Sequence, residues 1–206
     1  ESRRLKPVEV IRTFKESTKI EMDLRLEAAA AEEMEKNFNG DPYFKVPSVD
    51  WRRTSQRVLT IAQINGIPID ERELLIESGF DPNEIVARAA AALFKQVFRD
   101  GFFHADQHPG NLFVGTDGEI IAVDFGIMGR LDKPTRRYLA EMLMSFLNRD
   151  YSRVAEVHFE AGYVPSHKSV EAFTQACRAI AEPILDKSQT EISVARLLSQ
   201  LFQVTE

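Results

Sequence analysis

The segment from Phe103 to Leu131 places the tightest constraint on what this chain can fold into. It reads FHADQHPGNLFVGTDGEIIAVDFGIMGRL, in which Asn111 follows Asp106 by five residues and Asp124 follows Asn111 by thirteen. Two short apolar runs with a Gly-Thr-Asp-Gly turn between them separate Asn111 from Asp124, and this pattern predicts a β-hairpin. A hairpin returns the chain to its starting point, so we expect the amide and the second acid to lie side by side.

This order of acid, amide and acid is the one in which kinase-type phosphotransferases place a catalytic acid and two magnesium ligands. Asp106 would orient or deprotonate the acceptor hydroxyl or water, while Asn111 and Asp124 would supply the hard oxygen ligands that Mg²⁺ prefers. Gly126 would permit a sharp turn after Asp124. Each spacing alone also occurs where such side chains only cap turns and end strands, but the joint pattern favours a phosphotransferase-type site.

Two histidines, His104 and His108, flank Asp106 and raise the alternative of a zinc site. A catalytic loop is a poor place for the helical geometry of two histidine ligands, and no third histidine or cysteine is nearby in the sequence. We therefore expect His104 to be a packed residue that hydrogen-bonds the loop backbone, and His108 to approach phosphate or substrate.

Composition sets broader limits. The chain has 206 residues, of which 44% are hydrophobic, so it can bury one substantial core. Its net charge of -6 argues against a nucleic-acid partner, although it does not exclude a local basic patch. Cys177 is the only cysteine, which excludes an internal disulfide, and we expect it to be a buried helix residue.

No apolar run approaches the roughly 18 residues needed to cross a bilayer, and the first residues lack the apolar region of a signal peptide. The chain begins at Glu1 and ends inside an apolar-periodic segment that has no stop signal. We therefore expect a fragment of a longer protein.

Hydrophobic periodicity predicts few strands followed by many helices, which is the order of an α+β protein. A long helix is expected over residues 8–37, where an Asn-Gly-Asp-Pro signal stops it. Strands are expected at Phe44–Val49 and Arg57–Gln63, and these two should form an antiparallel pair.

The remainder of the chain is mostly helical by pattern. Asp81 should cap a helix that runs to Phe98 and is buried along one broad face. Asp132 should cap the first helix after the hairpin. The other expected elements are a short helix at Glu71–Glu77, the hairpin strands Leu112–Val114 and Glu119–Val123, and helices over residues 151–162, 167–185 and 190–204.

Three segments together resemble the UbiB family of atypical kinase-like proteins, in its bacterial form. HADQHPGN at residues 104–111 is similar to the family's catalytic loop, and VDFG at residues 123–126 is similar to its magnesium-binding segment. EMDLRLEAA at residues 21–29 resembles the family's E-x-D signature with the glutamate of helix C six residues after the first acid. The resemblance implies a protein-kinase-like fold, with a partial N-lobe over residues 1–64 and a helical C-lobe over residues 65–206.

The same resemblance implies roles for five further residues. Glu27 would be the glutamate that pairs with the strand lysine contacting ATP phosphates. Glu21 and Asp23 would be the family-specific acidic pair that replaces part of the usual substrate-facing surface, and the family's signatures together would obstruct the usual peptide groove. Gln63 and Ile64 would occupy the hinge whose backbone receives the adenine.

For function, the resemblance implies binding of ATP and Mg²⁺, and ATP hydrolysis or phosphotransfer to a small or lipid-linked acceptor in support of ubiquinone biosynthesis. Ubiquinone precursors or ubiquinone-biosynthesis enzymes would be partners, and the full-length protein would be cytoplasmic and peripheral to the inner membrane. The family's nucleotide loop, its strand lysine, its K-x-G-Q signature and its C-terminal membrane helices have no counterpart in this sequence. We therefore expect the chain alone to bind nucleotide weakly.

Two alternatives stay open at this point. Small-molecule phosphotransferases of the aminoglycoside or choline kinase type use a loop similar to HADQHPGN, but they seldom combine it with Asp-Phe-Gly and an E-x-D helix. A catalytically silent pseudokinase that works as a scaffold is the second alternative. The presence of all three residues, Asp106, Asn111 and Asp124, weighs against it.

Overall fold

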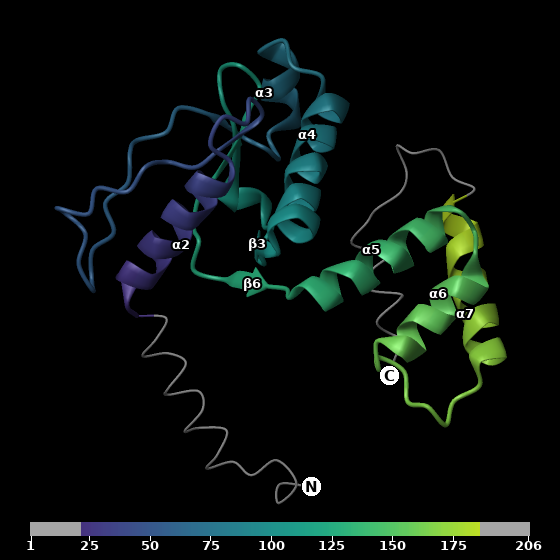
Figure 1. The fold of residues 1–206 in the computed structure, drawn as a ribbon. Helices are drawn as coiled ribbons and strands as arrows, with labels where there is room; N and C mark the ends of the chain where they lie inside the picture. The colour runs from purple at the N-terminus through teal and green to yellow at the C-terminus, as the bar shows by residue number, and fades with distance from the viewer. Residues whose placement is uncertain (1–21, 186–206) are drawn as a thin grey trace, which may run out of the picture. The chain divides into compact units, whose positions relative to one another are not determined.

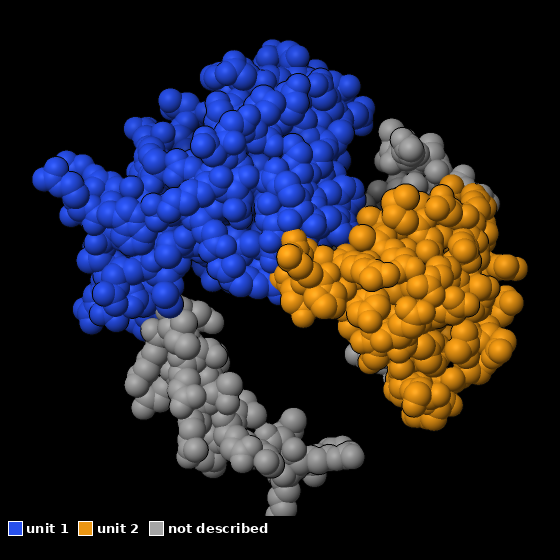
Figure 2. Space-filling view, viewed as in Figure 1, with its two compact units in different colours: residues 1–130 blue, residues 131–206 orange. Residues whose placement is uncertain are grey.

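The computed structural model describes residues 22–185 of the chain (Figure 1). The chain divides into two compact units, unit 1 up to Arg130 and unit 2 from Leu131 onward (Figure 2). Strands and helices both occur, so the α+β prediction is confirmed. The lobe boundary predicted at residues 64 and 65 falls inside unit 1 and stays a prediction. None of the helices within residues 22–185 is long and apolar enough to cross a membrane.

The first helix of unit 1, α2 (Leu24–Asn37), corrects the predicted long helix. Asp23 has a non-helical backbone, with φ −98° and ψ 89°, and its side chain accepts a hydrogen bond from Arg25 N at 3.2 Å. An aspartate that caps in this way starts a helix and does not continue one. The helix therefore begins at Leu24, and residues 8–21 of the predicted segment lie outside the described part of the chain.

A four-stranded sheet packs beside α2, with the strand order β1-β5-β4-β2. The predicted hairpin is confirmed, since Leu112 pairs with Ala122 and Val114 pairs with Ile120 in antiparallel register. β1 joins the sheet parallel to β5, and β2 joins it antiparallel to β4. The strands are β1 (Phe44–Lys45), β2 (Ile67–Pro68), β4 (Leu112–Val114) and β5 (Ile120–Ala122).

The predicted antiparallel pair of Phe44–Val49 with Arg57–Gln63 is largely wrong. The two segments touch only at a bridge between Val49 and Ile61, with one hydrogen bond on each side of it, from Asp50 N to Thr60 O and from Ala62 N to Ser48 O. Burial of Phe44 in the core directs β1 to the sheet instead. Residues 48–62, which we call the arm, form a loop that these contacts close.

Two helices follow β2 in the chain, α3 (Arg72–Glu77) and α4 (Pro82–Phe94). Asp81 caps α4 as predicted, accepting a hydrogen bond from Asn83 N at 2.9 Å. The chain then continues as a π-helix, η1 (Lys95–Asp100), which periodicity does not predict. The buried face of α4 is narrower than expected, because Val86 and Phe94 are exposed.

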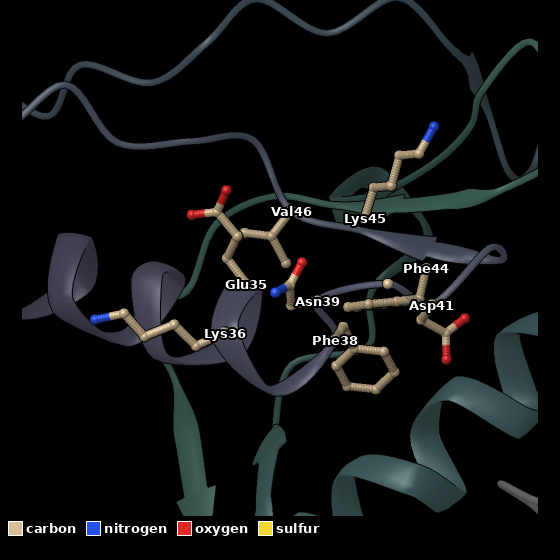
Figure 3. A pocket seen from close by; sticks show the side chains of 9 residues that line it. Glu35, Lys36, Phe38, Asn39, Asp41, Phe44, Lys45 and Val46 are labelled. Carbon is tan, nitrogen blue, oxygen red and sulfur yellow. The ribbon is translucent and has the colours of Figure 1, made fainter.

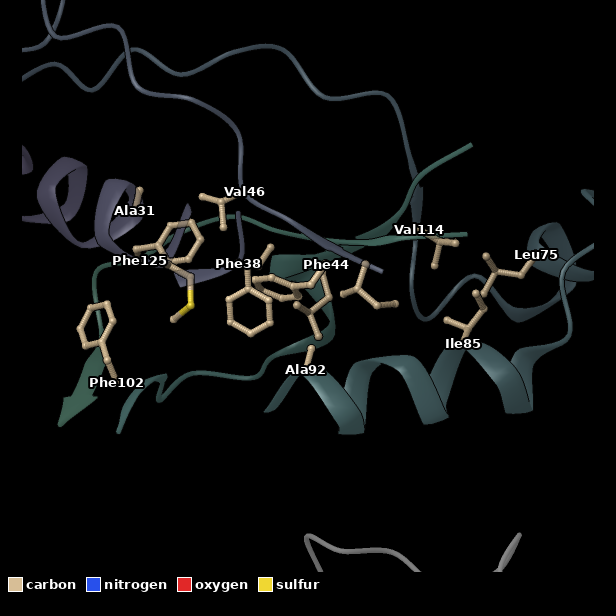
Figure 4. Packing of buried hydrophobic residues seen from close by; sticks show 14 residues of the cluster. Ala31, Phe38, Phe44, Val46, Leu75, Ile85, Ala92, Phe102, Val114 and Phe125 are labelled. Carbon is tan, nitrogen blue, oxygen red and sulfur yellow. The ribbon is translucent and has the colours of Figure 1, made fainter. Parts of the chain in front are cut away.

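The core of unit 1 lies between α2, the sheet and α4 (Figure 4). Figure 4 shows Ala31 of α2 and Ala92 of α4 on two sides of aromatic rings that include Phe38 and Phe44. Those two rings lie 4.3 Å apart between centroids. Phe125, directly after Asp124, belongs to the same core, so the candidate site is attached to the most buried part of the unit.

A second, two-stranded sheet frames the site loop. It pairs β3 (Phe102–His104) with β6 (Met128–Arg130) in antiparallel register. A side chain in place of Gly129 would put its Cβ about 2.2 Å from the tip of the Phe103 ring, so any other residue would have to displace this ring.

Unit 2 is a small helical bundle of α5 (Lys133–Leu147), α6 (Tyr151–Glu160) and α7 (Val170–Leu185). Asp132 caps α5 as predicted, accepting a hydrogen bond from Thr135 N at 2.8 Å. Cys177 is buried in the bundle core, which also confirms its prediction. The helix predicted over residues 190–204 lies outside the described residues.

Candidate functional site

The structure brings Asp106 and Asn111 into direct contact. Asn111 Nδ2 lies 3.3 Å from both the backbone oxygen and the Oδ2 atom of Asp106. Asn111 sits at the end of a short 3₁₀ turn, η2 (Pro109–Asn111), that leads into β4. Because its amide nitrogen is held by Asp106, the remaining Oδ1 atom of Asn111 is left to accept or to bind a cation.

Asp124 returns to the same place through the hairpin. Val123 N donates to Asn111 O at 2.9 Å, so Asp124 is one residue from the backbone partner of Asn111. This backbone hydrogen bond confirms the expectation that the hairpin brings the chain at Asn111 and at Asp124 together. Asp124 itself is exposed and has φ +61°, a left-handed conformation that is uncommon outside glycine. Its Oδ1 accepts a hydrogen bond from Gly126 N at 3.2 Å.

His104 contacts the backbone on both sides of the site. It is only 1% exposed, its Nδ1 accepts a hydrogen bond from Asp106 N at 3.2 Å, and its Nε2 lies 3.2 Å from Val123 O. An accepting Nδ1 and a carbonyl beside Nε2 define a neutral ring protonated on Nε2. His104 therefore ties the loop of Asp106 to the strand before Asp124, and its predicted role as a scaffold residue is confirmed.

Gln96 is the residue of this network that sequence reasoning missed. It is 2% exposed, and its Oε1 accepts a hydrogen bond from His104 N at 3.0 Å. It lies in the π-helix η1, whose extra residue per turn changes which side chains face the core. The sequence does offer one signal for its role, because Gln96 is a polar residue within the apolar run that ends at Phe98.

His108 turns back on its own loop. It precedes η2, and its Nδ1 accepts a hydrogen bond from Gly110 N at 3.1 Å. This ring nitrogen therefore caps the turn that carries Asn111. The expectation that His108 approaches phosphate or substrate stays a prediction.

Glu27 of α2 lies at the same site. Burial raises the pKa of Glu27, and the negative charge of Asp124 raises it further, while a hydrogen bond from the Phe125 backbone acts in the opposite direction. Glu27 is half-buried and forms no ion pair with any residue that the structure describes. Its charge is therefore adjacent to that of Asp124, where two carboxylates close together favour a shared cation.

A second contact ties α2 to the strand that follows the site. Arg130 of β6 forms a two-point ion pair with Glu33 of α2, with distances of 2.8 and 2.5 Å. The Arg130 guanidinium also lies 4.3 Å from the centre of the Phe102 ring. This pairing was not predicted, because nothing in the sequence relates residues 97 positions apart.

The remaining predicted site residues take no part in these contacts or lie outside the described part of the chain. Asp23 caps α2 and binds Arg25 through both oxygens, at 2.8 and 2.6 Å, and this hydrogen bonding lowers the pKa of Asp23. Gln63 is exposed and Ile64 half-buried, on the segment between the arm and β2. Glu21 lies outside the described residues.

Asn111 and Asp124 offer oxygen donors, which are the kind of ligand that Mg²⁺ prefers. Within residues 22–185, no group of three histidine, cysteine, aspartate or glutamate side chains could hold a metal ion. Mg²⁺ commonly takes only one or two protein oxygens and completes its shell with phosphates and water. Asn111 and Asp124 could provide those two oxygens.

A cleft of about 690 Å³ lies elsewhere on unit 1, between the end of α2 and β1 (Figure 3). Two of its charged residues already have partners, since Asp41 binds Lys95 at 2.5 Å and Lys45 binds Glu119 at 2.7 Å. None of the predicted site residues lines it, and we assign it no role.

Comparisons with known proteins define the class. The fold superposes on a solved structure, that of Rv3197 with erythromycin from Mycobacterium tuberculosis, with a TM-score of 0.66 and 22% identity, covering 95% of this chain and 56% of that one. The model of the ABC1 atypical kinase-like domain matches residues 2–158. The predicted kinase-like fold is therefore confirmed.

The chain belongs to the ABC1 atypical kinase-like family. It is 42% identical to a probable protein kinase UbiB of Pasteurella multocida, over 99% of this chain and 40% of the relative. It is 41% identical to a probable protein kinase UbiB of Azotobacter vinelandii, over 98% of this chain and 38% of the relative. The resemblance to the UbiB family is thereby confirmed, and the chain spans about two fifths of the length of these relatives.

Proposed function

We propose that this chain carries the magnesium-binding half of a UbiB-type ATP site that supports ubiquinone biosynthesis. The observation that carries the proposal is the assembly of Asp106, Asn111 and Asp124 around the start and end of one hairpin. The reaction would be ATP hydrolysis or phosphotransfer to a small or lipid-linked acceptor.

Each residue would have a separate task. Asp106 would orient or deprotonate the acceptor hydroxyl or water, and its own position is held by His104 and Asn111. Asn111 and Asp124 would hold Mg²⁺, which neutralises the charge on the phosphates. Glu27, placed beside Asp124, would pair with a phosphate-contacting lysine supplied by the longer protein.

The residues proposed to contact the adenine and the phosphoryl acceptor are assigned from the family resemblance. Gln63 and Ile64 would receive the adenine through their backbone groups. Glu21 and Asp23 would close the groove that peptide substrates use in ordinary protein kinases, so a small or lipid-linked acceptor fits better. In the full-length protein, the site would work in the cytoplasm against the inner membrane, with ubiquinone precursors or the enzymes that make them as partners.

Calorimetric titration of the chain with Mg-ATP tests the proposal. We expect weak binding, with a Kd on the order of 1 mM, because the chain spans only about two fifths of the length of its relatives. Asp124→Asn should weaken binding at least about 10-fold, since it removes a charged magnesium ligand. Asparagine also tolerates the left-handed backbone at this position, so the fold should survive.

Asp117→Asn is the matched control, because Asp117 is an exposed acid in the turn of the same hairpin. Its binding should equal that of the unaltered chain. Equal binding by the Asp124→Asn variant would contradict the assignment of this carboxylate to the metal.

A further inference from the structure

Arg130, the last residue of β6, contacts two other elements of unit 1 at once. Its guanidinium forms the two-point ion pair with Glu33 of α2, at 2.8 and 2.5 Å. The same group lies 4.3 Å from the centre of the Phe102 ring, and Phe102, in β3, is buried in the core of the unit. Arginine makes both contacts because its guanidinium is planar, with a fork of donors at its edge and a face that stacks on aromatic rings. One side chain therefore joins β6, β3 and α2.

Each of these three elements is connected to one acid of the candidate site. β3 ends two residues before Asp106, β6 begins four residues after Asp124, and α2 contains Glu27. β3 and β6 are paired in antiparallel register (Figure 1), and Ala105 N donates to Ile127 O at 2.9 Å just beyond the paired residues. A shift of β6 against α2 would therefore be transmitted to the backbone on which Asp106 and Asp124 lie.

The backbone at Asp124 is a part of the site that needs support from its surroundings. Its φ of +61° lies in the left-handed region, which costs free energy for a residue with a side chain and persists only where neighbouring contacts hold it. The Phe125 backbone is hydrogen-bonded to Glu27, and five residues later Arg130 is bound to Glu33. The segment that follows Asp124 is thus attached to α2 at both of its ends.

The ion pair itself contributes little to the stability of the unit. The side chains of Arg130 and Glu33 are 66% and 40% exposed, so water screens the attraction between them. A two-point contact nevertheless restricts the two elements to one relative position, because both hydrogen bonds form together in only one orientation. We therefore expect the pair to affect the geometry of the site more than the free energy of unfolding.

We propose that Arg130 is a positioning residue of the candidate site, which holds β6 against α2 and thereby fixes the backbone at Asp124. The inference rests on the proposed function, because it gives Arg130 a part in placing the magnesium ligand Asp124 beside Glu27. It goes beyond that function in naming a residue that acts through the backbone and not as a ligand of the metal or the nucleotide.

Amide chemical shifts of the chain without nucleotide test the proposal, because they report the position of groups in the folded state and not the stability of the fold. In Arg130→Gln, the signals of Phe125 and Gly126, five and four residues away, should move. Glu33→Gln, which removes the other partner from a different element, should move the same signals in the same direction. The double variant should move them no further than Arg130→Gln does, because the two side chains form one contact.

Lys36→Gln is the matched control. Lys36 lies on the same helix as Glu33, its side chain is 70% exposed, and it pairs with Glu32 of α2 at 3.3 Å. This variant removes a positive charge but no contact between elements, so the signals of Phe125 and Gly126 should stay in place. A further variant, R130K, keeps the charge without the fork or the planar face, and it should behave like the glutamine variant.

The consequence for binding is measured separately, by titrating the same variants with Mg-ATP. Arg130→Gln should raise the Kd for Mg-ATP about 3- to 10-fold, the effect of losing one exposed ion pair and one exposed cation–π contact. Lys36→Gln should leave the Kd unchanged.

Unmoved signals of Phe125 and Gly126 in Arg130→Gln would overturn the proposal, and so would equal movement in Lys36→Gln. An unchanged Kd in Arg130→Gln, beside measurable binding by the unaltered chain, would overturn it as well. If the unaltered chain binds no Mg-ATP, the proposed function fails, but the shifts still decide the role of Arg130 because they are measured without nucleotide.

Discussion

Replacing Gln96 by leucine should destabilise unit 1 through a single hydrogen bond. The Gln96 side chain is buried, and its Oε1 is the acceptor for His104 N at 3.0 Å. Leucine has a similar length but accepts no hydrogen bond, so a buried N–H would lose its partner. Such a loss costs about 1–3 kcal/mol, and for a unit of this size it corresponds to a decrease in Tm of roughly 4–12 °C.

The fluorescence of Trp51, which belongs to unit 1, provides the assay in a denaturant titration. Gln107→Leu is the matched control, because Gln107 is exposed and its Nε2 donates to His104 O at 3.0 Å in a bond that is only partly buried. The control should change the free energy of unfolding by less than about 0.5 kcal/mol. An unchanged midpoint in Gln96→Leu would refute the argument that this bond holds the loop.

Two further predictions concern packing and pH. Gly129→Ala should destabilise unit 1 by about 1–3 kcal/mol, measured by the same titration, because its Cβ would lie about 2.2 Å from the Phe103 ring. In unit 2, burial lowers the pKa of His158, so the unfolded state binds its proton more tightly than the folded state does. The Tm of unit 2, followed by circular dichroism, should be highest above the ordinary histidine pKa of about 6.5 and decrease as the pH falls below it. His158→Leu should remove that pH dependence, whereas the variant of the exposed His167, His167→Gln, should keep it.

The candidate site could be predicted from the sequence because its determinants are local. The hairpin between Asn111 and Asp124 follows from a Gly-Thr-Asp-Gly turn and two apolar runs, and no distant residue is needed to form it. Helix starts were predictable for the same reason, since Asp81 and Asp132 each bond an amide two or three residues ahead.

Features that depend on distant residues were not predictable in this way. Phe44 pairs with Ile120 because both side chains are buried in one core, and no local pattern relates them. Asp23 is a local exception: it bonds the amide two residues ahead, as Asp81 does, but it lies within an apolar-periodic stretch, so the pattern did not mark it as a helix start. Gln96 is buried in a π-helix and bonds to His104, eight residues later, and helical periodicity does not anticipate either feature.

The most direct test of the magnesium site is paramagnetic broadening of amide signals by Mn²⁺, an ion with the same oxygen preference as Mg²⁺. With ATP present, Mn²⁺ should broaden the amide signals of Asn111, Phe125 and Gly126 first, and leave those of unit 2 sharp. Broadening that begins instead at Glu141, Glu156 and Glu160, the three acids that bind Arg153 in unit 2, or that spreads evenly over the chain, would contradict the account.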